Sequence, residues 1–286
     1  MNSAVVKESS GRTPGPRTII EPRRGWRPID WREFIEYRDL LYFLVLREVT
    51  VLYKQTVLGF AWALLTPFFS MVVFTVIFGR LVRVPSDGTP YAIFSYVALL
   101  PWTYFASALT ASSGSLIQGS ALFTKVYFPR IFLPLVPTFA KLVDFAIASL
   151  LLAGLMLWYH VVPSAQIVAL PLLILLMGVT ASGAGLWLAA LAVQFRDVRH
   201  AMAVLTQLLM YAAPVVWPAS VVPRQYRVVY GLYPMAGVIE GFRAALIGTM
   251  PLPWDLIGAG TVSAIFVVVS GAMYFRRTER IFADVA

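Results

Sequence analysis

The sequence contains no cysteine, and only 13% of its 286 residues are charged. Without cysteine there can be no disulfide framework, no thiolate nucleophile and no cysteine-based metal site. Because 59% of the residues are hydrophobic, the chain has too little charge to cover a soluble protein of this length, which indicates an integral membrane protein. The formal charge of +9 does not indicate nucleic-acid binding, because the basic residues flank apolar segments instead of gathering on a polar domain.

Apolar segments recur along the chain at the length that a membrane helix requires, roughly 20 residues. Around the second of them, Gly114, Gly119 and several serines favour a loop after residue 112. We predict an all-α integral membrane protein with six transmembrane helices, at residues 55–79, 91–112, 132–160, 167–194, 201–217 and 256–275.

Lysine and arginine concentrate on one side of these predicted spans. They crowd the segment before the first span, the loops after the second and fourth, and the residues after the sixth. Because such loops stay in the cytoplasm, both termini are expected there, and an even number of spans is required. Residues 1–29, rich in Gly, Pro, Ser and Arg, are expected to form a disordered cytoplasmic tail with no secretory signal.

Two regions do not have the pattern of a simple span. In residues 30–54, Asp30 and Glu33 have capping-box spacing, and Trp31, Phe34, Ile35, Leu41, Tyr42 and Val45 are predicted to share one face. We expect an amphipathic helix at the cytoplasmic interface, with an elbow before the six-span domain of residues 55–286. Residues 218–254 are apolar but broken by proline and glycine, which predicts a re-entrant helical hairpin on the outer side before the last span.

Chemistry-bearing motifs are scarce. The phosphate-binding pattern G-x-x-x-x-G-K-[ST] is absent, so nothing predicts an ATP site in this chain. His160 and His200 are the only histidines and are predicted on opposite sides of the membrane, where they cannot share a metal ion or a catalytic centre. We therefore predict no catalytic residue, no metal and no cofactor in this chain.

Two pairs of opposite charge fall in or near the apolar segments. Lys141 with Asp144, and Glu240 with Arg243, are each spaced i, i+3, so each pair can neutralise itself on one helix face. The alternative is that such groups bind coupling ions in a secondary transporter.

Four segments, in this order, resemble the polysaccharide-export permeases of type-2 ATP-binding-cassette transporters. They are LREV through YKQTVLGFAW to Pro67 (residues 46–67), VYFPR (126–130), FRDV (195–198) and YPM (233–235). The resemblance runs from about residue 30 to the C-terminus. It implies a homodimer with two copies of a separate nucleotide-binding ATPase subunit, which would bind ATP and Mg, in a bacterial inner membrane. It also implies a channel between the two copies that exports an undecaprenyl-pyrophosphate-linked glycan, such as O-antigen.

The resemblance implies roles for particular residues. The ATPase would contact the loop between the fourth and fifth spans and the loop after the second, that is Phe195, Arg196, Asp197, Val198, Arg199, His200, Lys125 and Arg130. Arg38, Arg47 and Lys54 could meet the lipid pyrophosphate or headgroups, or they could serve as positive-inside anchors alone.

Aromatic residues, 14% of the chain, have two interpretations. Most lie near predicted span ends, as a lipid-interface belt requires: Trp102, Tyr104, Trp158, Tyr159, Trp217 and Trp254. A glycan channel also needs aromatic faces, and its candidates are Tyr91, Tyr96, Tyr230 and Tyr233. Alternatives to the glycan exporter are a permease of the same type for capsule, teichoic acid, another lipid or a drug, a secondary transporter, and a non-transporting scaffold.

Overall fold

The computed structural model describes residues 31–54, 59–119 and 128–279, and every regular element within these ranges is helical. Five helical segments there are long and apolar enough to cross a membrane. The chain is therefore a multi-pass membrane protein. The five segments are Ala61–Leu81, Tyr91–Gln118, Phe132–Trp158, Ala165–Gln194 and Trp254–Thr278.

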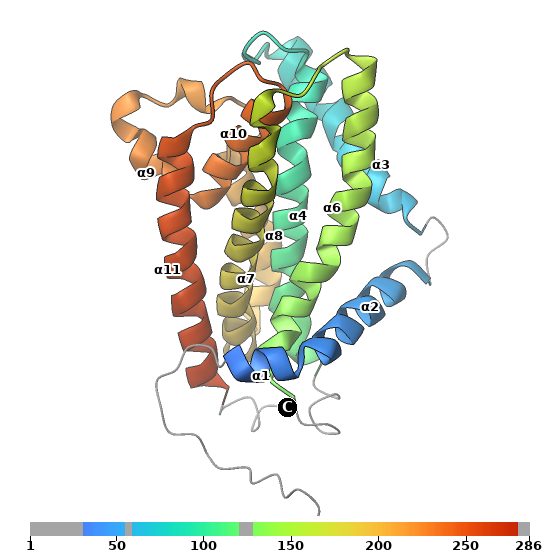
Figure 1. Cartoon of the computed structure of the whole chain (residues 1–286), viewed down its shortest axis with the longest axis vertical. Coiled ribbons are helices and arrows are strands. Elements are labelled where there is room, and N and C mark those ends of the chain that lie inside the picture. The colour runs from blue at the N-terminus through green and yellow to red at the C-terminus, as the bar shows by residue number, and fades with distance from the viewer. Residues whose placement is uncertain (1–30, 55–58, 120–127, 280–286) are drawn as a thin grey trace, which may run out of the picture.

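The helices follow one another with short connections (Figure 1). In chain order they are α1 (Trp31–Glu36), α2 (Arg38–Lys54), α3 (Ala61–Phe74) with the π-helical turn η1 (Thr75–Leu81), α4 (Tyr91–Gln118), α6 (Phe132–Trp158), η2 (Ala165–Ala169), α7 (Leu170–Gln194), α8 (Asp197–Ala212), η3 (Ala219–Val221), η4 (Arg224–Tyr226), α9 (Arg227–Gly231), α10 (Pro234–Leu246) and α11 (Trp254–Thr278). One end of the bundle carries α1 and the last turns of α11, and the other carries α9 and α10 (Figure 1). We call them the α1 end and the α10 end.

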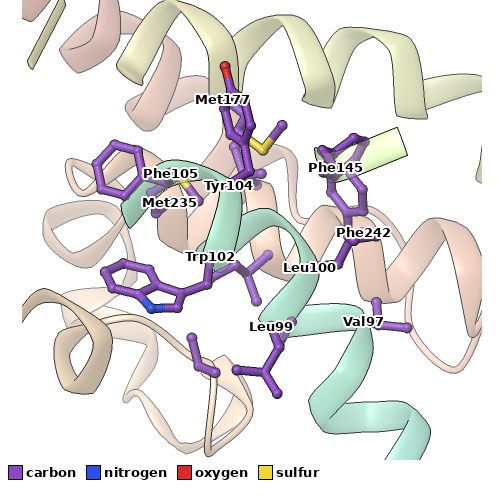
Figure 2. Close-up of a cluster of buried hydrophobic side chains, with 14 of the residues drawn as sticks. Val97, Leu99, Leu100, Trp102, Tyr104, Phe105, Phe145, Met177, Met235 and Phe242 are labelled. Carbon is purple, nitrogen blue, oxygen red and sulfur yellow. The ribbon is translucent and has the colours of Figure 1, made fainter. Parts of the chain in front are cut away.

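Helix α4 is the centre of the bundle, with α3, α6, α7, α8 and α10 packed around it. Of its most apolar 18-residue stretch, 83% is buried, against 11% for that of the segment formed by α3 and η1. Figure 2 shows large side chains of its middle turns, among them Trp102, Tyr104 and Phe105, in one cluster with Phe145 of α6, Met177 of α7 and Phe242 of α10. A helix that is apolar on all sides is expected to be enclosed in this way.

The predicted loop after residue 112 is wrong, because α4 continues to Gln118. Its serine cluster does not break the helix, since Ser113 donates to the carbonyl of Thr110 and Ser115 to that of Ser112, which satisfies the hydroxyls within the helix. The longer helix also places Trp102 and Tyr104 in its middle, 5% and 2% exposed. These two residues therefore do not belong to an interface belt.

The fifth predicted span, 201–217, corresponds to the 16-residue helix α8, which begins at Asp197 and ends at Ala212. It is shorter than the five long helices. Pro214 explains the early end, because proline disfavours helical geometry in the residue before it, and Ala213 is indeed extended.

Residues 31–54 form α1 and α2, and their apolar side chains divide between two sides instead of sharing the predicted face. Phe34 meets Phe132 of α6 edge to face, with ring centroids 5.2 Å apart, and Leu41 is buried. Ile35 and Tyr42 are exposed, at 62% and 61%. Packing against α6 therefore uses part of the apolar surface and leaves the rest uncovered. The predicted tail 1–29 and the Asp30 cap lie outside the described residues.

Residues 218–254 contain the short elements η3, η4, α9 and α10. All 13 residues of α10 are buried, because it lies against α4, α7 and α11. Close packing requires glycine here: a Cβ on Gly237 would lie 2.8 Å from the carbonyl oxygen of Leu256. The α10 end is thus closed by a helix inserted among the long ones.

Candidate functional site

A buried ion pair lies at the centre of the α10 end. Arg243 Nη1 is 2.7 Å from Glu240 Oε1, and the two residues are 5% and 7% exposed. The spacing predicted the pair, but its other partners come from elsewhere in the chain. The Arg243 guanidinium donates to the carbonyls of Val215 and Trp217 and lies 3.6 Å from the ring centroid of Phe94, while Glu240 accepts the amide of Ala219.

Three tyrosine hydroxyls hold the same part of the chain. Tyr91, at the start of α4, donates to the carbonyl of Val216 at 2.7 Å. Tyr230 donates to the carbonyl of Ala212, and Tyr233 to that of Leu209. The last turn of α8 and the extended residues after it are therefore tied to α4, α9 and α10 at several points, which makes this end a rigid unit.

The predicted channel tyrosines thus have structural partners within one chain. The fourth, Tyr96, is fully buried and donates to the carbonyl of Ala148 at 3.0 Å. Tyr230 and Tyr233 remain half-buried, and burial raises the pKa of both hydroxyls above the usual value. Their role in a channel stays a prediction.

The predicted ATPase-contact residues Phe195 to His200 lie at the α1 end. Phe195 caps the end of α7 and is 58% exposed, and Asp197 begins α8. Arg196, Asp197, Arg199 and His200 are exposed, and Val198 is half-buried. An acidic residue in the first turn complements the positive end of the helix dipole. This turn is therefore a compact, charged projection between two helices.

Arg130 lies at the same end. Its guanidinium donates to the carbonyl of Glu279, just after α11, at 2.9 Å, which ties the start of α6 to the end of α11. Gln194, the last residue of α7, also donates to α11, to the hydroxyls of Tyr274 and Thr278. Lys125 lies outside the described residues.

The three cations predicted to meet pyrophosphate or headgroups lie on α2, and all are exposed. Arg38 Nε is 3.5 Å from its neighbour Asp39. Arg47 and Lys54 are seven residues apart, which is close to two helical turns, so they point to the same side of α2. Arg47 and Lys54 therefore form an exposed cationic strip along α2.

A cavity that the sequence did not predict lies among α2, α3, α4 and α6. Its volume is about 340 Å³, within the range of small-molecule sites. Lys141 and Asp144 of α6, with Nζ and Oδ2 2.8 Å apart, belong to its wall together with Trp62, Thr66 and Thr103. The sequence showed the ion pair, but the residues that join it come from helices far apart in the chain.

Comparison with known proteins places these features in a family. A family model described as ABC-2 type transporter matches residues 39–247. The chain belongs to the ABC-2 type transporter family. This family match covers the turn at Phe195, the cavity and the ion pair at the α10 end.

Three similar proteins bear one name, O-antigen export system permease protein RfbA. The one from Myxococcus xanthus is 28% identical over 256 residues, which are 88% of this chain and 97% of the relative. Two from Klebsiella pneumoniae are 25% and 23% identical, each over 86% of this chain and 95% of the relative. The resemblance to polysaccharide-export permeases is confirmed.

Proposed function

We propose that this chain is the transmembrane permease subunit of an ATP-driven exporter that moves a lipid-linked polysaccharide of the O-antigen type out of the cytoplasm. The observation that carries the proposal is the end-to-end similarity to three O-antigen export permeases, which covers 95–97% of their length. The cargo would be carried on undecaprenyl pyrophosphate, across a bacterial inner membrane.

The energy would come from a partner. The sequence has no phosphate-binding loop pattern, so ATP and Mg would bind to a separate ATPase subunit, present in two copies for two copies of this chain. The exposed turn Phe195–His200, with Lys125 and Arg130 beside it in the prediction, is the proposed contact. The turn joins α7 to α8, and its charged side chains are exposed. A movement of the bound ATPase can therefore be transmitted through the turn to both helices.

We assign the remaining span, the fifth in chain order, to α8. Sixteen helical residues extend about 24 Å, somewhat less than the hydrocarbon core of about 30 Å. The extended residues that follow add to this length and reach Arg243 and Tyr91 at the α10 end. Six spans place both termini on one side, in agreement with the position of α1 and the end of α11 in Figure 1. The charge pattern favours the cytoplasm for that side, so α9 and α10 would form the re-entrant hairpin on the outer side.

The channel between two copies would use the helices that one chain leaves uncovered. In α3, Trp62 and Phe69 are 54% and 57% exposed, and in α8, Val204 and Leu208 are 60% and 62% exposed. Lipid or a second copy must cover these faces. In a dimer, the exposed aromatic side chains would line the glycan channel, where their ring faces can pack on the apolar faces of sugars.

The test is export in a bacterium that lacks its own O-antigen permease. We expect polysaccharide at the cell surface when this chain is expressed with its ATPase, and none when the ATP-binding lysine of that subunit is replaced. Surface polysaccharide that persists with the inactive ATPase and disappears when the proton gradient is dissipated would instead show a secondary transporter. Failure to export with an active, co-purifying ATPase would reject the glycan as cargo.

A further inference from the structure

The threonines of the described helices show a regular pattern with two exceptions. Most bond to the carbonyl four residues earlier, as Thr110 does to Ala106, Thr180 to Leu176 and Thr261 to Ile257. This bond is the usual way in which a threonine satisfies its hydroxyl in an apolar helix. Others of this kind are Thr50, Thr138, Thr206 and Thr278.

Thr66 of α3 and Thr103 of α4 are the exceptions, since within the described residues neither hydroxyl has a hydrogen-bond partner. They are 37 positions apart in the sequence and on different helices, yet both line the 340 Å³ cavity. Thr103 is half-buried and Thr66 is exposed on α3, and lipid would supply neither hydroxyl with a hydrogen bond, so the lack of a partner is costly in a membrane segment. Two of them facing one cavity indicate that a polar occupant supplies the partners.

The same wall has further hydrogen-bonding capacity. Pro67, also in the wall, has no N–H to give to the carbonyl of Ala63, four residues earlier, so this turn lacks one ordinary helical bond. Lys141 uses one of its three donors on Asp144, and the second carboxylate oxygen of Asp144 is available as an acceptor. Neutral donors, neutral acceptors and one carboxylate thus face the cavity together.

The charge balance selects among polar ligands. Lys141 is already neutralised by Asp144 at 2.8 Å, and the carboxylate of Glu48 on α2 also interacts electrostatically with the Lys141 ammonium group. An anionic phosphate would have to compete with two carboxylates for one ammonium group. A neutral ligand with many hydroxyls meets no such competition, and the indole of Trp62 in the wall offers an aromatic face for the C–H side of a sugar ring.

We propose that the cavity bounded by Trp62, Thr66, Thr103, Lys141 and Asp144 is a binding site for a neutral sugar ring, with its hydroxyls on the two threonines and Asp144. All of its wall comes from one chain, and Trp62 and Thr66 of that wall lie on the exposed face of α3. It rests on the proposed function in one respect: the exporter's glycan is the natural source of the sugar. A glycolipid and a free sugar share this chemistry, and the test separates them.

The absence of cysteine allows a direct binding assay on the purified full chain in nanodiscs. Ala63→Cys puts one thiol in the cavity wall, and Ala153→Cys puts one on an exposed part of α6 as the control. The rate of N-ethylmaleimide labelling is measured with octyl glucoside, glucose or octyl phosphocholine, each below micelle-forming concentration. We expect octyl glucoside to slow labelling at Ala63→Cys several-fold and octyl phosphocholine to have no effect, with Ala153→Cys unchanged throughout.

Protection by glucose at the same concentration would assign the site to free sugar, whereas protection by octyl glucoside alone would assign it to a glycolipid. Adding Thr66→Val and Thr103→Val, which keep the side-chain shape, should raise the half-protecting concentration about tenfold, as the loss of two hydrogen bonds predicts. Serine at the same positions should restore it, and Thr180→Val, whose hydroxyl bonds to its own helix, should not change it.

Equal protection by octyl phosphocholine, no protection by either sugar, or full protection in the double valine variant would overturn the proposal. The assay contains no ATPase. A chain that binds sugar here but fails to export therefore contradicts only the proposed function, and a chain that exports but shows no protection contradicts only this site.

Discussion

At the α10 end of the bundle, Arg243 and Glu240 are 5% and 7% exposed, and besides each other they bond to the backbone of Val215, Trp217 and Ala219. At the α1 end, Arg196, Asp197 and Arg199 are exposed, and no ion pair within the described residues involves them. The two ends differ because the charged side chains are buried at one end and exposed at the other. Buried charges need internal partners, whereas exposed charges can stay available to another protein. The α10 end therefore satisfies its charges internally, whereas the α1 end leaves its charges accessible.

The largest effect on stability is expected from Arg243→Met. It leaves the Glu240 carboxylate buried without its cation and removes the donors from two carbonyls, which should destabilise the protein by about 3–5 kcal/mol. Thermal unfolding of the purified protein in detergent measures the loss. Arg227→Met is the matched control, because its pair with Asp255 is 27% and 41% exposed and should contribute less than about 1 kcal/mol.

The double variant Glu240→Leu with Arg243→Met sharpens this result. With both charges gone there is no buried unpaired group, so the double variant should be more stable than Arg243→Met alone. If the single variant unfolds at the wild-type temperature, the ion pair does not hold the α10 end together.

A smaller effect is expected from Tyr91→Phe, which removes the hydrogen bond to the carbonyl of Val216. The loss of one buried bond should cost about 1 kcal/mol. Tyr274→Phe is the counterpart at the α1 end, where the hydroxyl accepts from Gln194 at an exposed position and its loss should be hardly measurable. Equal losses for the two variants would remove the distinction between a rigid and an accessible end.

The sequence predicted the long helices well where apolar length alone decides. The third and sixth predicted spans, 132–160 and 256–275, lie within three residues of α6 and α11 at each end. It failed at the end of α4, because the serines bond within the helix. The apolar pattern also did not predict how early α8 ends, because Ala213 and the residues after Pro214 are as apolar as a membrane span.

Which residues meet across helices was the less predictable part. The i, i+3 spacing gave both ion pairs, but not the carbonyls of Val215 and Trp217 that complete one site. Nor could it bring Thr66 and Thr103 to one cavity with Asp144. Such contacts depend on the rotation and closeness of packed helices, which small residues set locally: a Cβ on Gly183 of α7 would lie 2.7 Å from the backbone of Val268 of α11.

At the α1 end, Asp197→Arg should lower the unfolding temperature only slightly, because the side chain is exposed and its interaction with the helix dipole is worth less than about 1 kcal/mol. It should nevertheless lower glycan export and the ATPase stimulation by this chain, since it reverses a charge in the proposed contact. Co-purification with the ATPase and the rate of ATP hydrolysis measure the change, with Arg277→Glu, an exposed reversal on α11, as the control. Normal export and normal assembly in the Asp197→Arg variant would show that this turn does not transmit the ATPase motion.

The smallest effect on stability, and the finest distinction, is expected from replacing Arg47 and Lys54 with glutamine together. Both side chains are exposed on one side of α2, so the fold loses nothing. If they meet a lipid pyrophosphate, the glycolipid concentration at half-maximal transport should rise about tenfold, and Arg47→Lys with Lys54→Arg should largely restore it.

If Arg47 and Lys54 are positive-inside anchors alone, transport should follow the amount of correctly inserted protein. Thiol labelling from each side of the membrane, with single cysteines in this cysteine-free chain, measures that amount. A rise in the half-maximal concentration with unchanged insertion would therefore assign the strip to the cargo, because anchoring cannot alter the concentration dependence of molecules that are already inserted.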